Sequence, residues 1–95
     1  MYFTIFGKEN CPYCVRAKEL LQSKMLEFTY RDVIEDELSF MTMNQWVYES
    51  SGKVPKTVPQ IFVEDRHIGG YDDLVDYFES NKEVIQASDF DIGVL

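Results

Sequence analysis

The sequence predicts an α/β fold in which a βαβ unit is followed by a ββα unit, giving a four-stranded mixed sheet flanked by helices. A strand, an amphipathic helix and a second strand occupy the first 33 residues, and two short strands and a last helix follow a loop containing Gly and Pro. With 95 residues, 45% of them hydrophobic, the chain is long enough to bury one core. We therefore expect a single domain over residues 1–95, with its core in about 1–81 and a C-terminal extension, 82–95, that fits no template.

The βαβ unit begins with the apolar run YFTIF, residues 2–6, which has the composition of a buried strand. A helix is expected from Pro12, because proline suits the first helical turn. The segment EFTYRDV, residues 27–33, predicts the second strand, and since the whole unit has the size of a βαβ motif its two strands should be parallel. Four apolar residues recur at helical spacing between the strands: Ala17, Leu20, Leu21 and Met25.

In the second half of the chain, the sequence predicts a helix, a hairpin and a final helix. Residues 35–50 lack Gly and Pro and favour a helix. The loop SSGKVPKTVP, 50–59, leads into the strand QIFVE, 60–64, and HI, 67–68, completes the hairpin. After a Gly-Gly pair, a last helix is expected from about residue 71, because its apolar residues keep the i, i+3, i+4, i+7 spacing: Tyr71, Leu74, Val75 and Phe78.

Charge and hydropathy exclude two classes of partner. The net charge of −8 argues against a nucleic-acid surface, since phosphate recognition requires clustered Lys and Arg. No stretch approaches the ~20 apolar residues that a membrane span needs, and no charged leader with a long apolar run opens the chain. We expect a cytoplasmic monomer without nucleic-acid or membrane partners.

The only two cysteines, Cys11 and Cys14, lie three positions apart where the first helix begins. A disulfide between them would close almost no loop, so a purely structural disulfide is not expected. A zinc site would need a second half, and the only histidine, His67, falls in a short strand where we expect plain sheet surface. A C-x-x-C motif in a βαβ setting favours a redox pair, and no metal site is expected.

The position at a helix start gives the two cysteines different expected roles. Unpaired N–H groups and the positive end of the helix dipole favour a thiolate at Cys11, and Lys8 adds a cationic neighbour. Cys14 lies about one turn deeper in the helix, where this effect is weaker. We expect Cys11 to attack a substrate disulfide, and Cys14 then to attack Cys11 and release the reduced product.

Three motifs occur together in this chain: CPYC at 11–14, TVPQIFV at 57–63 and HIGGYDDL at 67–74. With these motifs in this order, residues 1–81 resemble the glutaredoxins. The resemblance implies a thioredoxin-like fold and glutathione-dependent reduction of protein disulfides and of glutathione mixed disulfides. It also implies that glutathione is a co-substrate, that no cofactor is bound, and that ribonucleotide reductase is a client protein.

The resemblance further implies a glutathione site. In the family the proline of TVP is cis and faces the cysteines, and the residue before it pairs with the backbone of the glutathione cysteine. Helix-start N–H groups and an aspartate after the glycine pair suit the carboxylate and ammonium groups of the γ-glutamyl end. The glycyl carboxylate would face a lysine before the first cysteine, while Gln45 and Lys53 are unassigned candidates for a second contact. The expected glutathione contacts are Lys8, Tyr13, Thr57, Val58, Pro59, Gly70, Tyr71, Asp72 and Asp73.

Two other functions stay open. A redoxin served by a flavin thioredoxin reductase would use the same cysteines, but it would have no use for Lys8 or for the GGYDD segment. An iron–sulfur scaffold or carrier would bind a cluster between Cys11 of two chains and two glutathione molecules. Pro12 argues against this second alternative, because cluster-holding members of the family commonly have a smaller or more flexible residue there.

Overall fold

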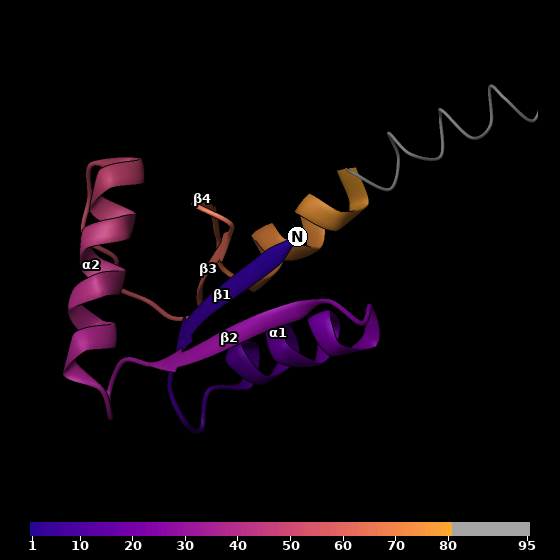
Figure 1. The fold of residues 1–95 in the computed structure, drawn as a ribbon, viewed down its shortest axis with the longest axis horizontal. Helices are drawn as coiled ribbons and strands as arrows, with labels where there is room; N and C mark the ends of the chain where they lie inside the picture. The colour runs from indigo at the N-terminus through magenta and orange to yellow at the C-terminus, as the bar shows by residue number, and fades with distance from the viewer. Residues whose placement is uncertain (81–95) are drawn as a thin grey trace, which may run out of the picture.

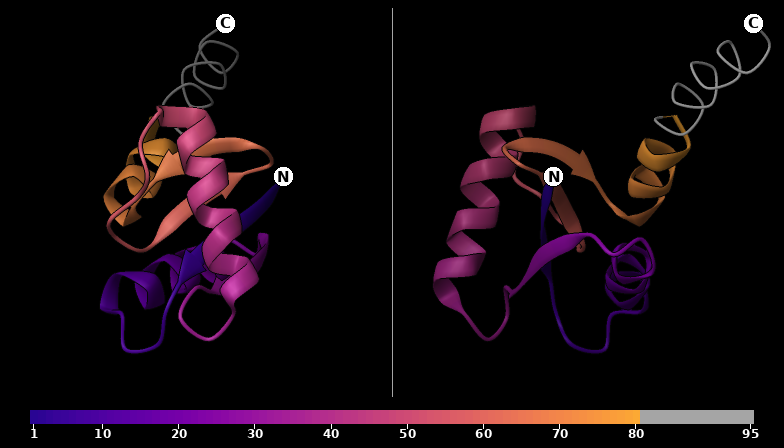
Figure 2. Two further views of the ribbon diagram at one scale, coloured as in Figure 1. Left: turned by 90° about the vertical axis from the view of Figure 1, so that its left-hand side faces the viewer. Right: turned by 45° about the vertical axis from the view of Figure 1, so that its right-hand side comes forward.

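The computed structural model describes residues 1–80, which form one four-stranded sheet with helices on both faces (Figure 1). Figure 2 shows that α2 covers one face, while α1 and the last helix lie on the other. The extension expected at 82–95 lies outside the described residues. None of the helices within residues 1–80 is long and apolar enough to cross a membrane. The elements are β1 (Tyr2–Gly7), α1 (Pro12–Ser23), β2 (Glu27–Asp32), α2 (Glu37–Ser51), β3 (Gln60–Val63), β4 (Arg66–Gly69) and helical residues 71–80.

The strands follow the order β2-β1-β3-β4 across the sheet. β1 and β2 are parallel, as predicted, whereas β3 runs antiparallel to both β1 and β4. β1 and β3 therefore occupy the two inner positions, where both faces of a strand are covered. This explains why all four residues of β3 are buried and why both strands are so rich in apolar residues.

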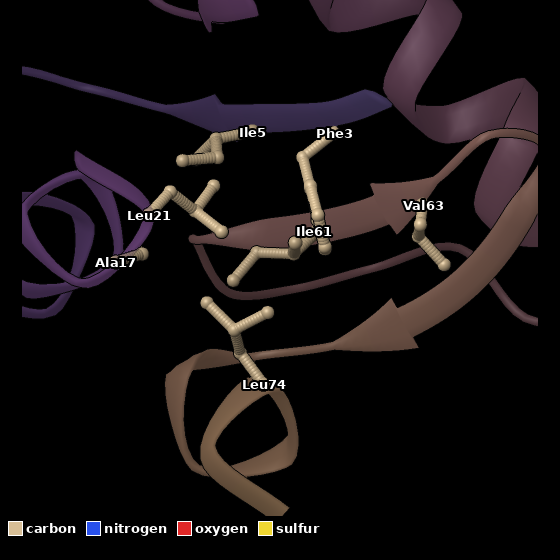
Figure 3. Packing of buried hydrophobic residues seen from close by; sticks show 7 residues of the cluster. All are labelled: Phe3, Ile5, Ala17, Leu21, Ile61, Val63 and Leu74. Carbon is tan, nitrogen blue, oxygen red and sulfur yellow. The ribbon is translucent and has the colours of Figure 1, made fainter. Parts of the chain in front are cut away.

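Two apolar clusters, one on each face of the sheet, form the core. Alternation along β1 sends Ile5 to one face and Phe6 to the other. The Phe6 cluster lies under α2, where Trp46 and Phe62 both meet the Phe6 ring edge to face. The other cluster, beneath α1 and the last helix, consists of Phe3, Ile5, Ala17, Leu21, Ile61, Val63 and Leu74 (Figure 3).

The predicted helices and strands are all present within two residues of their expected ends, but the role expected for Met25 is wrong. Helix α1 ends at Ser23, and Met25 is 92% exposed with a left-handed φ of 58°. The N–H of Met25 bonds to the Gln22 carbonyl, and the N–H of Leu26 bonds to the Leu21 carbonyl, both at 3.0 Å. This pair of bonds is a Schellman motif, which turns the chain toward β2 before the helical spacing can continue.

The apolar residues of α2 form an irregular pattern because only one narrow face of this helix is buried. Met43 and Val47 are buried on the Phe6 cluster, whereas Phe40 and Met41 remain 45% and 58% exposed. Ser39 is also buried, and its hydroxyl donates to the Asp36 carboxylate while accepting a hydrogen bond from the side chain of Arg31. Because its hydrogen bonds are satisfied locally, this polar residue can be buried. Its presence on the buried face interrupts the apolar stripe.

Candidate active site

Cys11 and Cys14 form a disulfide at the start of α1. Cys11 is the N-cap residue, with Pro12 directly after it, and its Sγ accepts a hydrogen bond from the Cys14 N–H at 3.2 Å. Cys14 is completely buried, and Cys11 retains 6% exposure. Of the two cysteines, only Cys11 retains any exposure to solvent, which is consistent with its expected role as the attacking cysteine.

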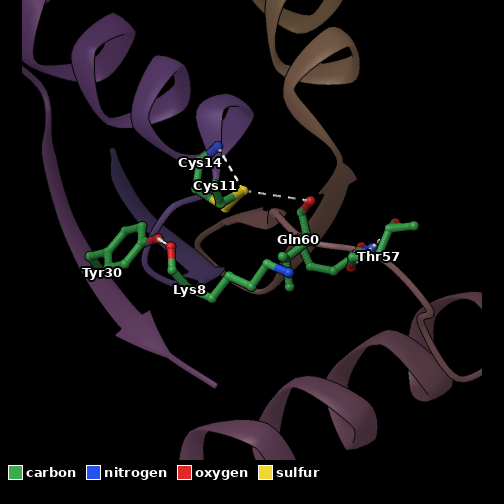
Figure 4. Close-up of a disulfide and its surroundings, with 7 residues drawn as sticks. Lys8, Cys11, Cys14, Tyr30, Thr57 and Gln60 are labelled. Carbon is green, nitrogen blue, oxygen red and sulfur yellow. Dashed lines mark hydrogen bonds between the residues drawn. A yellow bond between two sulfur atoms is a disulfide. The ribbon is translucent and has the colours of Figure 1, made fainter. Parts of the chain in front are cut away.

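The end of β1 is shaped to receive the buried cysteine. A Cβ at Gly7 would lie 2.9 Å from Cys14 Sγ and would collide with the phenolic oxygen of Tyr30, so only glycine fits there. Tyr30 donates a hydrogen bond to the Lys8 carbonyl at 2.9 Å, which holds the loop that leads to the cysteines (Figure 4). Burial, with the negative charge of Asp32, raises the pKa of Tyr30 above its ordinary 10.0, so the phenol keeps the proton that it donates.

The segment Thr57–Pro59 faces the disulfide from the other side. The Val58–Pro59 peptide bond is cis, which confirms the prediction for this proline. The carbonyl oxygen of Val58 lies 4.0 Å from Cys11 Sγ, a contact that a dashed line from Cys11 marks in Figure 4. Main-chain atoms of Val58 are therefore within reach of any group that approaches Cys11.

A pocket of about 270 Å³ opens between this segment and the start of the last helix. It contains eight of the nine expected glutathione contacts, which come from three separate parts of the chain. Its inner wall includes the Gly70 N–H, which donates to the Asp73 carboxylate at 2.9 Å. This bond is one half of a capping box, and it fixes the Asp73 side chain at the mouth of the helix. The lining residues are Tyr13, Thr57, Val58, Pro59, Gly70, Tyr71, Asp72 and Asp73.

The ninth expected contact, Lys8, lies in a neighbouring groove of about 410 Å³. Thr57 and Val58 line both hollows, so the groove and the pocket lie on either side of this short segment. The groove also contains Lys56, which the sequence analysis did not single out although it directly precedes the TVP motif. Its remaining lining residues are Val33, Ile34, Phe40, Met43 and Pro55, whereas Gln45 and Lys53 are absent from its lining.

The sequence analysis expected His67 on open sheet surface, and this expectation is wrong. Its ring is partly buried against Phe62, with 4.8 Å between the ring centroids, and its Nε2 lies 2.8 Å from Oε1 of Gln60. Burial lowers the pKa of His67 below its ordinary 6.5, and the negative charge of Asp73 opposes this shift in part. No group of three or more His, Cys, Asp or Glu side chains within residues 1–80 could hold a metal ion.

The family model for glutaredoxins matches residues 3–68, which include both cysteines and the cis-proline. The chain belongs to the glutaredoxin family. A Vibrio cholerae glutaredoxin is 40% identical over 86 residues, which are 85% of this chain and 94% of that protein. Escherichia coli glutaredoxin 1 is 38% identical over 86 residues, again 85% of this chain and 96% of its own length.

The solved structures agree with this assignment. Reduced Escherichia coli glutaredoxin superimposes with a TM-score of 0.68 at 36% sequence identity, covering 87% of this chain and 99% of that one. The fold is therefore the thioredoxin-like fold of the glutaredoxins, as expected. Glutaredoxins are thiol oxidoreductases that use glutathione as a substrate, and the Cys11–Cys14 pair fits their C-x-x-C motif.

Proposed function

We propose that this glutaredoxin is a glutathione-dependent dithiol oxidoreductase that reduces both glutathione mixed disulfides and protein disulfides. One arrangement supports it above all: the pocket lined by eight expected glutathione contacts lies next to Cys11, since Val58 both lines the pocket and approaches the Cys11 sulfur. A pocket with main-chain groups, a helix start and two aspartates beside a reactive sulfur suits a small zwitterionic thiol. A redoxin that used only a protein reductant would not need it.

Reduction of a glutathione mixed disulfide requires Cys11 alone. The Cys11 thiolate attacks the glutathione sulfur of the substrate, the substrate S–S bond breaks, and the released thiolate takes a proton from water. Cys11 is then joined to glutathione. A second glutathione thiolate attacks the sulfur of that bound glutathione, which releases oxidised glutathione and restores the Cys11 thiolate.

Reduction of a protein disulfide requires both cysteines. Cys11 attacks one sulfur of the protein disulfide and forms a mixed disulfide, and Cys14 then attacks Cys11 Sγ. The client leaves with two thiols, and the Cys11–Cys14 disulfide present in the structure is the oxidised product. Two glutathione molecules return the two electrons: the first opens this disulfide, and the second releases oxidised glutathione.

The protein assists these steps by stabilising charge at Cys11. The Cys14 N–H already donates to Cys11 Sγ at 3.2 Å, and the same donor stabilises a thiolate at the helix start. The same interaction also makes Cys11 a better leaving group when a second glutathione thiolate attacks the sulfur of the glutathione joined to Cys11. Cys14 is buried against Gly7, so it reacts only with a sulfur already delivered to Cys11.

The two hollows divide the proposed glutathione site by charge. The γ-glutamyl end would lie in the pocket, with its carboxylate at the start of the last helix and its ammonium group at Asp73 or Asp72. The glycyl carboxylate would lie across the Thr57–Val58 segment, in the groove that contains Lys8 and Lys56. Lys56 is thus our candidate for the second glycyl contact.

We further propose that the protein acts as a cytoplasmic monomer and that a disulfide of ribonucleotide reductase is one of its clients. The similarity to Escherichia coli glutaredoxin 1 over 85% of the chain supports a role among small dithiol glutaredoxins. Reduction of ribonucleotide reductase by this protein, with glutathione as the electron source, would test the client directly. Absence of turnover with an active reductase would exclude this client while leaving the general activity intact.

The decisive experiment is turnover of a mixed disulfide between glutathione and a small thiol. NADPH oxidation is followed with glutathione and glutathione reductase in one sample, and with thioredoxin reductase in a parallel one. We expect NADPH consumption only in the glutathione system. Consumption only with thioredoxin reductase would make the proposed glutathione contacts wrong.

A further inference from the structure

Behind the pocket, a buried glutamine joins two segments that line it or lead to it. Gln60, the first residue of β3, is only 8% exposed. Its Nε2 lies 3.0 Å from the Thr57 carbonyl oxygen and 3.5 Å from the Thr57 hydroxyl, while its Oε1 lies 2.8 Å from Nε2 of His67. Neither Gln60 nor His67 lines the pocket or the groove.

The acceptor at Thr57 fixes the orientation of the whole network. A carbonyl oxygen can only accept, so the group that faces it must be the NH₂ of the Gln60 amide. The amide oxygen then faces His67 and can only accept as well. His67 must therefore donate from Nε2, and because burial keeps its ring neutral near pH 7, its single ring proton is on Nε2 and not on Nδ1.

The network connects the two walls of the pocket through the sheet. Thr57 lies directly before Val58, whose carbonyl approaches Cys11. His67 lies in β4, and the chain leaves this strand through Gly69 to form the other wall at Gly70 and Asp73. His67 pairs with Phe62 in the β3–β4 register and stacks on its ring, which restricts rotation of the imidazole. A fixed imidazole holds the amide, and the amide holds the Thr57 carbonyl.

We propose that Gln60 and His67 are positioning residues that set the width of the glutathione pocket by holding the Thr57–Val58 segment at a fixed distance from the helix start at Gly70. This inference rests on the proposed function, because it names what determines substrate affinity at the same site. Neither side chain touches the reacting sulfur atoms. Loss of the network therefore weakens substrate binding and leaves the chemical step at Cys11 unchanged.

The first test is the protonation state of the histidine, which does not depend on any activity. In the ¹⁵N-labelled protein at pH 7.5, two-bond ¹H–¹⁵N correlation spectra of the imidazole should show a protonated Nε2 and an unprotonated Nδ1. Since His67 is the only histidine, its signals need no assignment strategy. A proton on Nδ1 alone would overturn the network and the positioning role with it.

The second test uses variants that remove the bonds and keep the volume. His67→Phe retains a ring over Phe62 and removes the donor, and Gln60→Met removes both amide bonds. We expect KM for a glutathione mixed disulfide to rise about fivefold in His67→Phe, the effect of one lost hydrogen bond, and at least as much in Gln60→Met, which loses two. In both variants kcat should stay within about twofold of wild type. Arg66→Gln, at an exposed position of the same strand, is the matched control and should change neither constant.

The outcomes separate this inference from the proposed function. An unchanged KM in either folded variant, or a fall in kcat alone, would overturn the positioning role while glutathione-dependent turnover by wild type still stood. A wild-type protein inactive with glutathione would instead refute the proposed function, and the histidine spectrum would still decide whether the network exists. Should Gln60→Met fail to fold, His67→Phe alone decides, because it removes the donor to Gln60 and keeps an aromatic ring over Phe62.

Discussion

The carbonyl oxygen of Val58 lies 4.0 Å from Sγ of Cys11, although the two residues are 47 positions apart in the sequence. This contact brings the main chain of the cis-proline segment to the sulfur of Cys11, the one cysteine of the two that retains exposure to solvent. A peptide that pairs with the Val58 backbone as a short strand would therefore present its own sulfur to Cys11. Binding and reaction are linked by one residue, and the following predictions test the two separately.

Replacing each cysteine by serine should separate the two reactions. Cys11→Ser is expected to abolish all turnover, because it removes the attacking sulfur. Cys14→Ser should retain reduction of glutathione mixed disulfides and lose dithiol reduction of a protein disulfide, since only the second reaction needs Cys14. Both activities are measured by coupled NADPH oxidation, and circular dichroism confirms the fold. Equal losses of both activities in both variants would contradict the assigned roles.

Asp73→Asn should weaken substrate binding without disturbing the helix start. The asparagine oxygen can still accept from the Gly70 N–H, but the negative charge that would bind the glutathione ammonium is gone. We expect KM for the mixed disulfide to rise about tenfold, as for loss of a charge-assisted hydrogen bond. The control is Asp76→Asn, on an exposed face of the same helix. Similar KM values for the two variants would show that Asp73 does not hold the ammonium group.

Gly7→Ala should destabilise the protein by about 1 to 3 kcal/mol, because the added methyl group would press on buried neighbours. Those neighbours are Tyr30 and Cys14, the latter with its Sγ at 2.9 Å from the new carbon. Urea denaturation of the oxidised protein measures the change. The double variant Gly7→Ala/Tyr30→Phe should recover part of the loss, since it removes the phenolic oxygen. A neutral effect of Gly7→Ala would mean that the end of β1 is packed less tightly than described.

Met25→Gly should stabilise the protein by about 0.5 to 1 kcal/mol. Met25 has a φ of 58° in the Schellman motif, where a side chain is disfavoured and glycine is not. Its side chain is 92% exposed, so its removal loses almost no packing. The free energy of unfolding is compared with that of Met25→Ala, which shortens the side chain and retains the Cβ. The same gain in both variants would assign the effect to the side chain rather than to the backbone.

His67 should make stability fall as the pH drops below 6.5. Burial lowers the pKa of His67 in the folded state, so over the window between that pKa and 6.5 the unfolded chain binds more protons. Stability therefore rises with pH in this window. His67→Phe lacks this contribution, and the difference in unfolding free energy between wild type and variant should shrink from pH 7.5 to pH 5.5. A constant difference would indicate that the histidine titrates alike in both states.

Most of the fold follows from local patterns in the sequence. Period-two and period-3.6 spacing located the strands and helices, and the glycines and prolines separated them. Met25 was misplaced because the helix ends at a left-handed methionine, a conformation that glycine usually marks. No local pattern could have shown this, since the signal that ends the helix is a pair of main-chain hydrogen bonds.

The site was only partly predictable from the sequence, because residues far apart in the chain are brought together by strand pairing in the sheet. The cysteines, the cis-proline and the glycine pair were found from motifs. Lys56 was missed since its groove is formed by four separate segments, although its position before TVP was a usable signal. The Gln60–His67 bond was missed because the β3–β4 register contains an irregularity between Ile61 and Phe62, which simple counting along a hairpin does not anticipate.

The two halves of the chain contribute different properties to the site. Both cysteines and Gly7 belong to the βαβ unit, whereas seven of the eight pocket residues come from positions 57–73. Chemical reactivity is thus encoded in one half and ligand choice in the other. The halves are joined where β3 pairs with β1, in the two apolar clusters and at the Val58–Cys11 contact. Exchanging residues 54–80 for the equivalent part of another family member should transfer substrate preference without replacing the dithiol itself, so this boundary is a natural site for building chimaeric redox proteins.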